Sequence, residues 1–327
     1  MKLRRLMFIL LPLLILTTAA GLCFGSARLS PGQILAALGG TGEHTVRIIL
    51  LNIRLPRVLG GLLAGVGLSV SGVLLQTVTA NELASPNVIG INSGAGLAVI
   101  ALLTFVPGAA RWVSFGAFWG AFAVALVILA LGRKLGASRS GILLTGIAVT
   151  TLLNALISFL SLLDEGVLAE YNHFTVGSLQ GLQLKDLVVP AVIIFASLGV
   201  ALVLSARLNV LCMGDEAAAA LGIRVLPVRI GAMACAAASA AAVVSFAGLL
   251  GFVGLVVPHI ARALAGQRVG KLLAVGAAAG AVVVLLADLL GRTLFAPSEL
   301  PVGILMSLIG APYFLILLAR RNRYAGN

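Results

Sequence analysis

The sequence predicts an all-α integral membrane protein, a compact bundle of about ten transmembrane helices. Hydrophobic residues make up 61% of the 327 residues and charged residues only 10%, whereas soluble domains carry about 25% charged residues. The mean hydropathy is +1.16. The apolar runs are continuous, as in 122–131, and therefore lack the alternation that strands of a transmembrane β-barrel require.

Apolar runs of about 20 residues, separated by polar residues or by Pro and Gly, are interpreted as the membrane spans. They lie near 6–24, 58–79, 88–106, 112–132, 141–163, 186–206, 230–247, 256–265, 270–292 and 302–319. The segment near 256–265 is short, and glycine and proline break the apolar stretch around it. Irregular backbone persists at membrane depth only where protein or a cavity surrounds it. The break therefore indicates a transport path inside the bundle.

The first apolar run follows a basic N-terminus, as in a signal peptide, but its length of about 19 residues favours an uncleaved span. Most of the 22 Lys and Arg fall in loops on the same side as this N-terminus. This bias predicts that both termini are cytoplasmic. It also accounts for the net charge of +12 without a nucleic-acid partner. The three cysteines form no CxxC pair, so we expect small hydrophobic side chains and no disulfide or metal site.

Three arginines fall on the predicted outer side, against the bias. Arg54 and Arg57 precede the second span, and Arg292 ends the ninth. Clustered guanidinium groups there would pair with carboxylates of a partner; snorkelling of each arginine to the interface is the alternative. Asp288 lies four residues before Arg292, which favours an ion pair on one helix. An ionisable residue inside a span is also a functional candidate, and both interpretations stay open.

The loop between the sixth and seventh spans predicts a short surface helix on the inner side. Asp215 and Glu216 suit the positive end of a helix, the alanines that follow propagate it, and Gly222 can end it in the left-handed conformation. A helix of about two turns is unstable alone. We therefore expect it to pack on this chain or on a cytoplasmic partner.

Polar residues on the inner side predict a turn and contacts at helix ends. The polar residues and proline of the loop 81–87 favour a fixed turn. Asn92 enters a span just afterwards, where it lines a water-filled path or bonds to another helix. His259 and Arg262 share one face of the short eighth segment, where a polar contact at the helix end is favoured over a transport role. Small residues at four-residue spacing, as in 61–65 and 276–280, favour close helix packing.

No GxxxxGK[ST] phosphate loop is present; the nearest string, 266–272, has the wrong spacing and no hydroxyl. The chain is therefore not expected to be an enzyme, and ATP hydrolysis would need a partner chain. A secondary transporter is the alternative class. It would need intramembrane carboxylates or a cation site, for which Asp288 beside an arginine is thin support.

Six motifs occur in order from about residue 50 to the C-terminus. They are Arg54-Leu-Pro-Arg57, Gly72-Val-Leu-Leu-Gln76, Asn81-Glu-Leu-Ala-Ser-Pro86 with Gly90, Leu208-Asn-Val-Leu211 with Gly214-Asp-Glu-Ala217 and Leu221-Gly222, Phe252-Val-Gly-Leu-Val-Val-Pro-His259 with Arg262, and Glu299-Leu-Pro-Val-Gly303 with Gly310-Ala-Pro312. Together they resemble the FecCD-type permeases, the membrane subunits of ABC importers for iron-siderophores, haem and cobalamin.

The resemblance implies one polytopic permease domain over residues 1–327, in a bacterial or archaeal cytoplasmic (inner) membrane. It implies a second permease copy in a homodimer, two ATP-binding cassette subunits on the cytoplasmic side and an extracytoplasmic solute-binding protein. The chain itself would bind no cofactor, since ATP and Mg would be bound by the ATPase. Iron chelate, haem and cobalamin remain alternative substrates.

The resemblance also implies roles for residues at matching positions. Those for docking of the binding protein are Arg54, Arg57 and Arg292. Those for coupling to the ATPase are Gly214, Asp215, Glu216, Ala217, Leu221 and Gly222. Those of the inner gate are Asn81, Leu83, Ser85, Pro86, Ser138 and Ser140. Structural or pathway candidates are Gln76, Asn92, Pro258, His259, Arg262 and Asp288. Ser85 departs from the family, which often has an acidic residue there, and the 138–141 turn is not the commonest form.

Overall fold

The computed structural model describes residues 3–25, 29–106, 108–134, 139–296 and 298–325, and all regular elements within them are helices. Seven helical segments are long and apolar enough to cross a membrane, and three shorter apolar helices accompany them. The all-α membrane architecture is thereby confirmed. The apolar helices are α1 (Leu3–Cys23), α4 (Leu55–Thr79), α5 (Ile91–Phe105), α6 (Val113–Lys134), α7 (Arg139–Ser161), α9 (Leu184–Leu211), α11 (Val225–Ala247), α12 (Val253–Ala265), α13 (Val269–Thr293) and α14 (Val302–Ala325).

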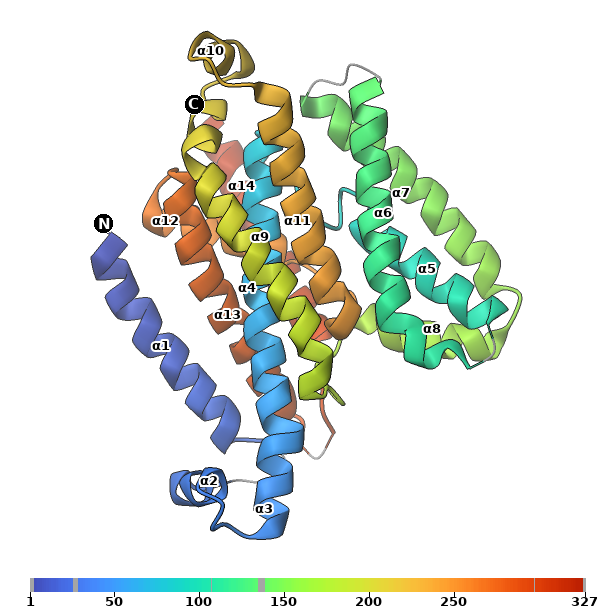
Figure 1. Ribbon diagram of the computed structural model, residues 1–327, viewed down its shortest axis with the longest axis vertical. Coiled ribbons are helices and arrows are strands. Elements are labelled where there is room, and N and C mark those ends of the chain that lie inside the picture. The colour runs from blue at the N-terminus through green and yellow to red at the C-terminus, as the bar shows by residue number, and fades with distance from the viewer. Residues whose placement is uncertain (1–2, 26–28, 107, 135–138, 297, 326–327) are drawn as a thin grey trace.

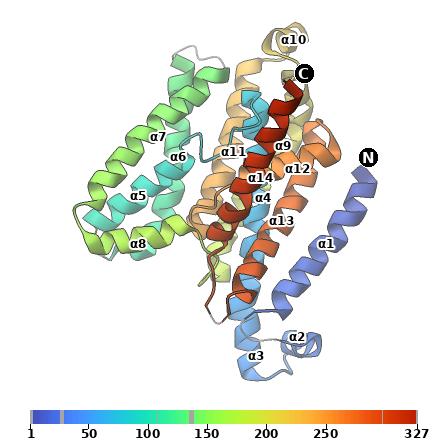
Figure 2. The same ribbon diagram turned by 180° about the vertical axis from the view of Figure 1, so that it is seen from behind.

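Shorter elements connect the apolar helices at the two ends of the bundle. They are α2 (Pro31–Leu38), α3 (His44–Ile48), the π-helical turn η1 (Ile49–Arg54), the 3-10 turn η2 (Ala109–Trp112), α8 (Glu165–Val176) and α10 (Asp215–Ala220). Helix α10 projects from one end, and α2 and α3 project from the opposite end (Figure 1). Both marked termini lie in the half of the molecule toward α10 (Figure 2).

Helix α4 forms the centre of the bundle. In the helical segment His44–Thr79, which includes α4, 83% of the most apolar stretch is buried inside the chain, whereas the corresponding share in α1 is 22%. Helices α9, α11, α12 and α13 all pack on it, and α5, α6, α7 and α8 form a second group beside it (Figures 1 and 2). The site described below is built from α4 and from elements that surround it.

Glycines bring the backbones of α4 and α13 into contact. A Cβ atom added at Gly65 would meet the carbonyl of Gly280, and one added at Gly280 would meet the carbonyl of Gly65 and the hydroxyl of Ser69. No larger residue fits at either position without moving a backbone. The small-residue spacing therefore serves helix packing, as expected, and it brings the Arg57 and Asp288 turns of the two helices together.

The start of α4 differs from the sequence-based expectation. The predicted span began at residue 58, but helical structure runs without interruption over His44–Thr79. Pro56 lies in this stretch and has no N–H to donate. The π-helical turn Ile49–Arg54 precedes it, and the Leu55 amide bonds to the Leu50 carbonyl. This widened turn lets the helix continue into the proline, and it places Arg54 inside the helix.

Helix α10 agrees with the prediction from its sequence. It follows Gly214 and is stopped by Gly222, whose φ of 77° is left-handed. Asp215 also forms an ion pair with Arg229 of α11 at 2.8 Å. This pair holds the short helix against the base of the bundle.

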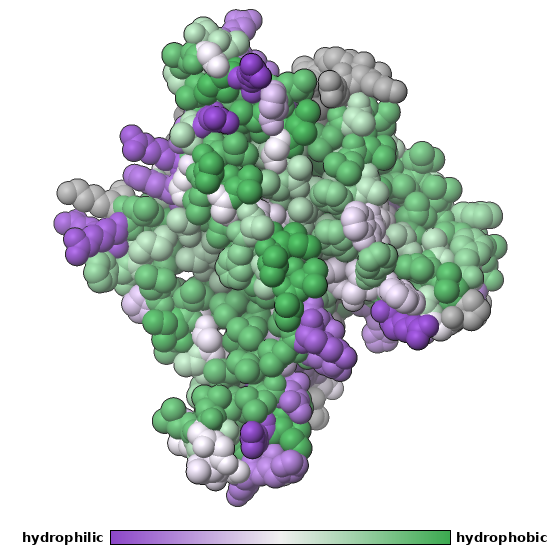
Figure 3. Space-filling view, in the orientation of Figure 1, coloured by the Kyte–Doolittle hydropathy of each residue, from purple (hydrophilic) through white to green (hydrophobic). Residues whose placement is uncertain are grey.

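Hydrophobic side chains cover much of the outer surface. Leu16 of α1, Val192 and Val203 of α9 and Phe159 of α7 are all more than half exposed. Figure 3 shows apolar residues over the middle of one face, with hydrophilic residues gathered toward the two ends. Such a belt is what a protein surrounded by lipid presents.

Candidate functional site

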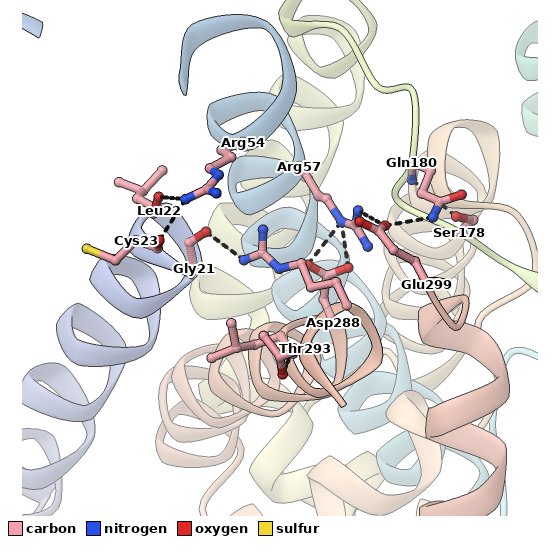
Figure 4. A network of polar contacts seen from close by, with 12 residues as sticks. Gly21, Leu22, Cys23, Arg54, Arg57, Ser178, Gln180, Asp288, Thr293 and Glu299 are labelled. Carbon is pink, nitrogen blue, oxygen red and sulfur yellow. Dashed lines mark hydrogen bonds and ion pairs between the residues drawn. The ribbon is translucent and has the colours of Figure 1, made fainter. Parts of the chain in front are cut away.

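The predicted arginines meet two carboxylates at the end of the bundle opposite α10. Arg54, Arg57, Arg292, Asp288 and Glu299 are called the arginine cluster below (Figure 4). Arg54 ends the π-helical turn, and Arg57 lies one turn later in α4. Asp288 and Arg292 lie in the last turns of α13, and Glu299 lies in the segment before α14. The cluster therefore joins parts of the chain that are far apart in sequence.

Arg57 occupies the middle of the cluster. Its Nε donates to both carboxylate oxygens of Asp288, at 2.9 and 3.1 Å, and its Nη1 donates to Oε2 of Glu299. The same oxygen of Glu299 accepts a hydrogen bond from Nε2 of Gln180 at 2.7 Å. Arg57 thus links α4 to α13, to the start of α14 and to the loop between α8 and α9 (Figure 4).

The other two arginines cap helix α1. Nη1 of Arg54 donates to the carbonyls of Leu22 and Cys23 at 2.6 and 2.8 Å, and Nη2 of Arg292 donates to that of Gly21 at 2.6 Å. The last four carbonyls of a helix have no partner within it, and this end carries a partial negative charge. The two guanidinium groups donate hydrogen bonds to these carbonyls and place positive charge beside the negative end of the helix. They thereby fix the end of α1 to α4 and α13.

The three arginines are largely buried within the chain. Arg54, Arg57 and Arg292 are only 4%, 6% and 3% exposed, because carbonyls and carboxylates of this same chain surround them. Their role in docking a partner stays a prediction. The expected pair of Asp288 with Arg292 is present at 3.5 Å, but the shorter contact of Asp288 is to Arg57.

Glu299 is the member of the cluster that the sequence patterns did not single out, although it begins one of the six motifs. Its partners, Arg57 and Gln180, are 242 and 119 residues away, so no local spacing could reveal them. Partial burial alone would raise the pKa of Glu299, but the hydrogen bonds from Arg57 and Gln180 lower the pKa below its ordinary value. Glu299 is therefore a carboxylate at neutral pH.

A cavity of about 840 Å³ opens beside the cluster, between the start of α4 and the loop before α9. Its polar wall consists of Asn52, Arg57, Gln180, Gln183 and Glu299. The ion pair between Arg57 and Glu299 therefore forms part of the cavity wall and can be reached from the cavity.

A second polar group lies at the α10 end. Nη2 of Arg262 donates to Oε1 of Gln76 at 2.9 Å, and its Nη1 is 3.4 Å from the carboxylate of Glu82. Three of the candidate segments thus meet: α4, the loop that follows it, and α12. His259 is partly exposed on the same helix, and among the described residues no hydrogen bond to its side chain is found. The polar contact expected at this helix end is therefore made by Arg262.

The break before α12 is real. Residues 248–252 are not helical, Phe252 has a left-handed φ of 62°, and Pro258 is buried inside the helix that follows. Asn92 is buried at the start of α5. The described hydrogen bond between α5 and α7 is made by its neighbour, since Ser93 Oγ donates to Asn154 Oδ1 at 2.9 Å.

The loop expected to form the inner gate is a series of turns. Asn81 Oδ1 accepts the amide hydrogen of Leu83 at 2.8 Å, and Ser85 and Pro86 are buried. This confirms the fixed turn but does not test gating. Ser138 lies outside the described residues, and Ser140 lies in the first turn of α7. Among the residues that the structure describes, no group of three or more His, Cys, Asp or Glu could hold a metal ion.

Comparison with known proteins agrees with this architecture. Residues 13–320 match the model of the FecCD transport family. The Fe(3+)-citrate import system permease protein YfmE of Bacillus subtilis is 36% identical over 95% of this chain and 93% of its own length. The hemin transport system permease protein HmuU of Yersinia pestis is 38% identical over 84% of each chain.

A solved structure supports the same relationship. It shows a metal-chelate type ABC transporter in an inward-facing conformation, and its chain superposes with a TM-score of 0.88 at 29% identity, covering 97% of this chain and 99% of that chain. The agreement extends over nearly the whole length of both chains. Family model, relatives and fold therefore all lead to one conclusion: the chain belongs to the FecCD transport family.

Proposed function

We propose that the chain is the membrane-spanning permease subunit of an ABC importer for an iron chelate such as a ferric siderophore, with haem or cobalamin as the alternative cargo. Ferric citrate and hemin are the cargoes named for YfmE and HmuU. The chain has no phosphate loop, so the ATP and its Mg belong to a separate ATPase. The chain itself then hydrolyses nothing and binds no cofactor.

The observation that carries the proposal is membership of the FecCD transport family, and a polar stripe on an apolar helix adds support for a second copy of the chain. Thr151, Asn154 and Ser158 of α7 are all exposed, and their spacing puts them on one helix face, although Asn154 also accepts a hydrogen bond from Ser93 and Thr151 donates one to the Ile147 carbonyl. Polar groups facing lipid are costly and normally face a bundle interior or a water-filled cavity. The stripe therefore supports a second copy of the chain at this face, with the water-filled path enclosed between the two copies.

Helix α10 supports a contact with the ATPase. Six residues are too few for a stable free helix, yet the Asp215–Arg229 pair and the two bounding glycines fix it. Met213 and Leu221, which flank the helix, are more than half exposed. A cavity of about 660 Å³ lies beside it and includes Met213 and Arg268 in its lining. A protruding rigid element with exposed apolar residues suits insertion into a partner.

Orientation follows from this assignment. The α10 end, in whose half of the molecule both termini lie, is cytoplasmic, and the arginine cluster faces the solute-binding protein on the other side of a bacterial or archaeal inner membrane. ATP binding would close the ATPase pair and move α10. The contact of Arg262 with Gln76 and Glu82 links α12 to the predicted inner gate, and this gate would then alternate with the outer mouth.

Purification from the native membrane tests the proposal. The chain should co-purify with a phosphate-loop ATPase whose activity rises when the solute-binding protein is added, and vesicles should take up the ⁵⁵Fe chelate with ATP. Recovery of the chain without any ATPase, with uptake driven by an ion gradient, would instead support a secondary transporter.

A further inference from the structure

We propose that Glu299 occupies the position on Arg57 that a carboxylate of the solute-binding protein takes in the docked complex. Docking would then displace Glu299 from Arg57 and replace it with the carboxylate of the partner. This inference rests on the proposed function. It assigns the 840 Å³ cavity as the docking site for one acidic side chain of that partner, and it makes Glu299 the group that the partner displaces.

Among the three arginines of the cluster, Arg57 is the one that reaches the cavity wall. Arg54 and Arg292 donate to the carbonyls at the end of α1 and would leave those carbonyls without these donors if they moved. Arg57 holds two carboxylates of different character. The Asp288 side chain is 2% exposed and that of Glu299 is 21% exposed.

The exposed carboxylate is the exchangeable one. Asp288 accepts two hydrogen bonds from Arg57 deep in the bundle, and freeing it would leave a buried charge unpaired. Glu299 contacts Arg57 through a single oxygen at the cavity edge, so water or another acid can replace it at small cost. The cluster also has three guanidinium groups and two carboxylates. Its excess positive charge attracts an incoming acidic group.

Displacement of Glu299 would remove one contact that holds the start of α14. Glu299 lies three residues before Val302, where α14 begins, and its contacts with Arg57 and Gln180 tie this start to α4 and to the α8–α9 loop. Backbone bonds from Leu300 to Gly291 and from Gly303 to Gly177 hold the same segment, at 3.0 and 3.1 Å. Docking would thus remove one of several tethers and loosen the start of α14 without unfolding it.

The test measures affinity of the solute-binding protein for the complete transporter in nanodiscs. Glu299→Gln removes the competing charge while its amide can still contact Gln180, so the affinity should rise by up to about fivefold, the upper end of the range set by loss of one partly exposed ion pair. Glu299→Asp is one methylene too short to keep the contact and should act in the same direction. The control is Asp186→Asn, which removes an equal charge close to the cavity but from a residue bonded to the Gln183 amide.

The outcomes separate this inference from the proposed function. Suppose the solute-binding protein binds the wild-type transporter. An affinity for the folded Glu299→Gln transporter that is unchanged or weaker would then overturn the exchange. An equal rise in the Asp186→Asn variant would also overturn it, because the effect would then be general surface charge. Failure of the wild type to bind any solute-binding protein would refute the proposed function itself, and the inference with it.

Discussion

Asp288→Asn tests whether the arginine cluster holds the bundle together. The carboxylate is 2% exposed and lies 2.9 Å from Arg57 and 3.5 Å from Arg292. Removing one partner of a buried ion pair costs about 3–5 kcal/mol, because the remaining charge stays buried without compensation. Glu299 still neutralises part of the charge on Arg57, and the new amide can accept one bond. We therefore expect the lower end of this range, about 3 kcal/mol.

The assay is thermal unfolding of the purified chain in mild detergent, followed by tryptophan fluorescence. A loss of about 3 kcal/mol should lower the midpoint by several degrees, since about 2–4 °C per kcal/mol is typical of chains of 150–250 residues. Asp186→Asn is the matched control and should change the midpoint little, because Asp186 is exposed and bonds only locally to the backbone. A midpoint for Asp288→Asn within about 1 °C of wild type would refute the reasoning from burial.

Three further predictions use the same preparation. Gly280→Val should destabilise the chain by more than about 1–3 kcal/mol, because the valine side chain would meet the backbone of α4. The control is Gly199→Ala, where an added Cβ meets nothing within 4 Å. This variant should be neutral or slightly stabilising in the same assay. Asp215→Asn removes a half-exposed ion pair worth about 0.2–1 kcal/mol, so unfolding should change little while co-purification of the ATPase decreases. Asp186→Asn removes an exposed carboxylate at the start of α9, at the opposite end of the bundle, and should keep the ATPase. The stability difference between wild type and Glu299→Gln should be constant from neutral pH to about pH 5 and should shrink as the pH falls further. The pKa of Glu299 is lowered in the folded chain, so its contribution is present above the unfolded pKa and is lost as the pH falls toward the folded pKa. A difference undiminished at about pH 3 would contradict an ionic origin.

Much of the fold follows from local features of the chain. The apolar runs predicted the positions of the spanning helices, because length and hydropathy suffice when lipid is the solvent. The alanines and Gly222 likewise predicted α10, since start, propagation and stop are all signalled within nine residues. The order of six motifs predicted the family. Local features placed the start of the second span near residue 58, whereas the preceding π-helical turn carries the helix through Pro56.

The sequence by itself determined that this is a polytopic helical membrane protein of the FecCD type, because hydropathy, helix signals and motifs are properties of contiguous residues. Only the tertiary structure decided what the arginines do. Arg57 meets Asp288 and Glu299 across more than 230 residues, and two other guanidinium groups cap α1. Such contacts depend on which helix faces touch, and glycine-mediated packing of α4 against α13 fixes those faces. No spacing within one segment encodes that approach.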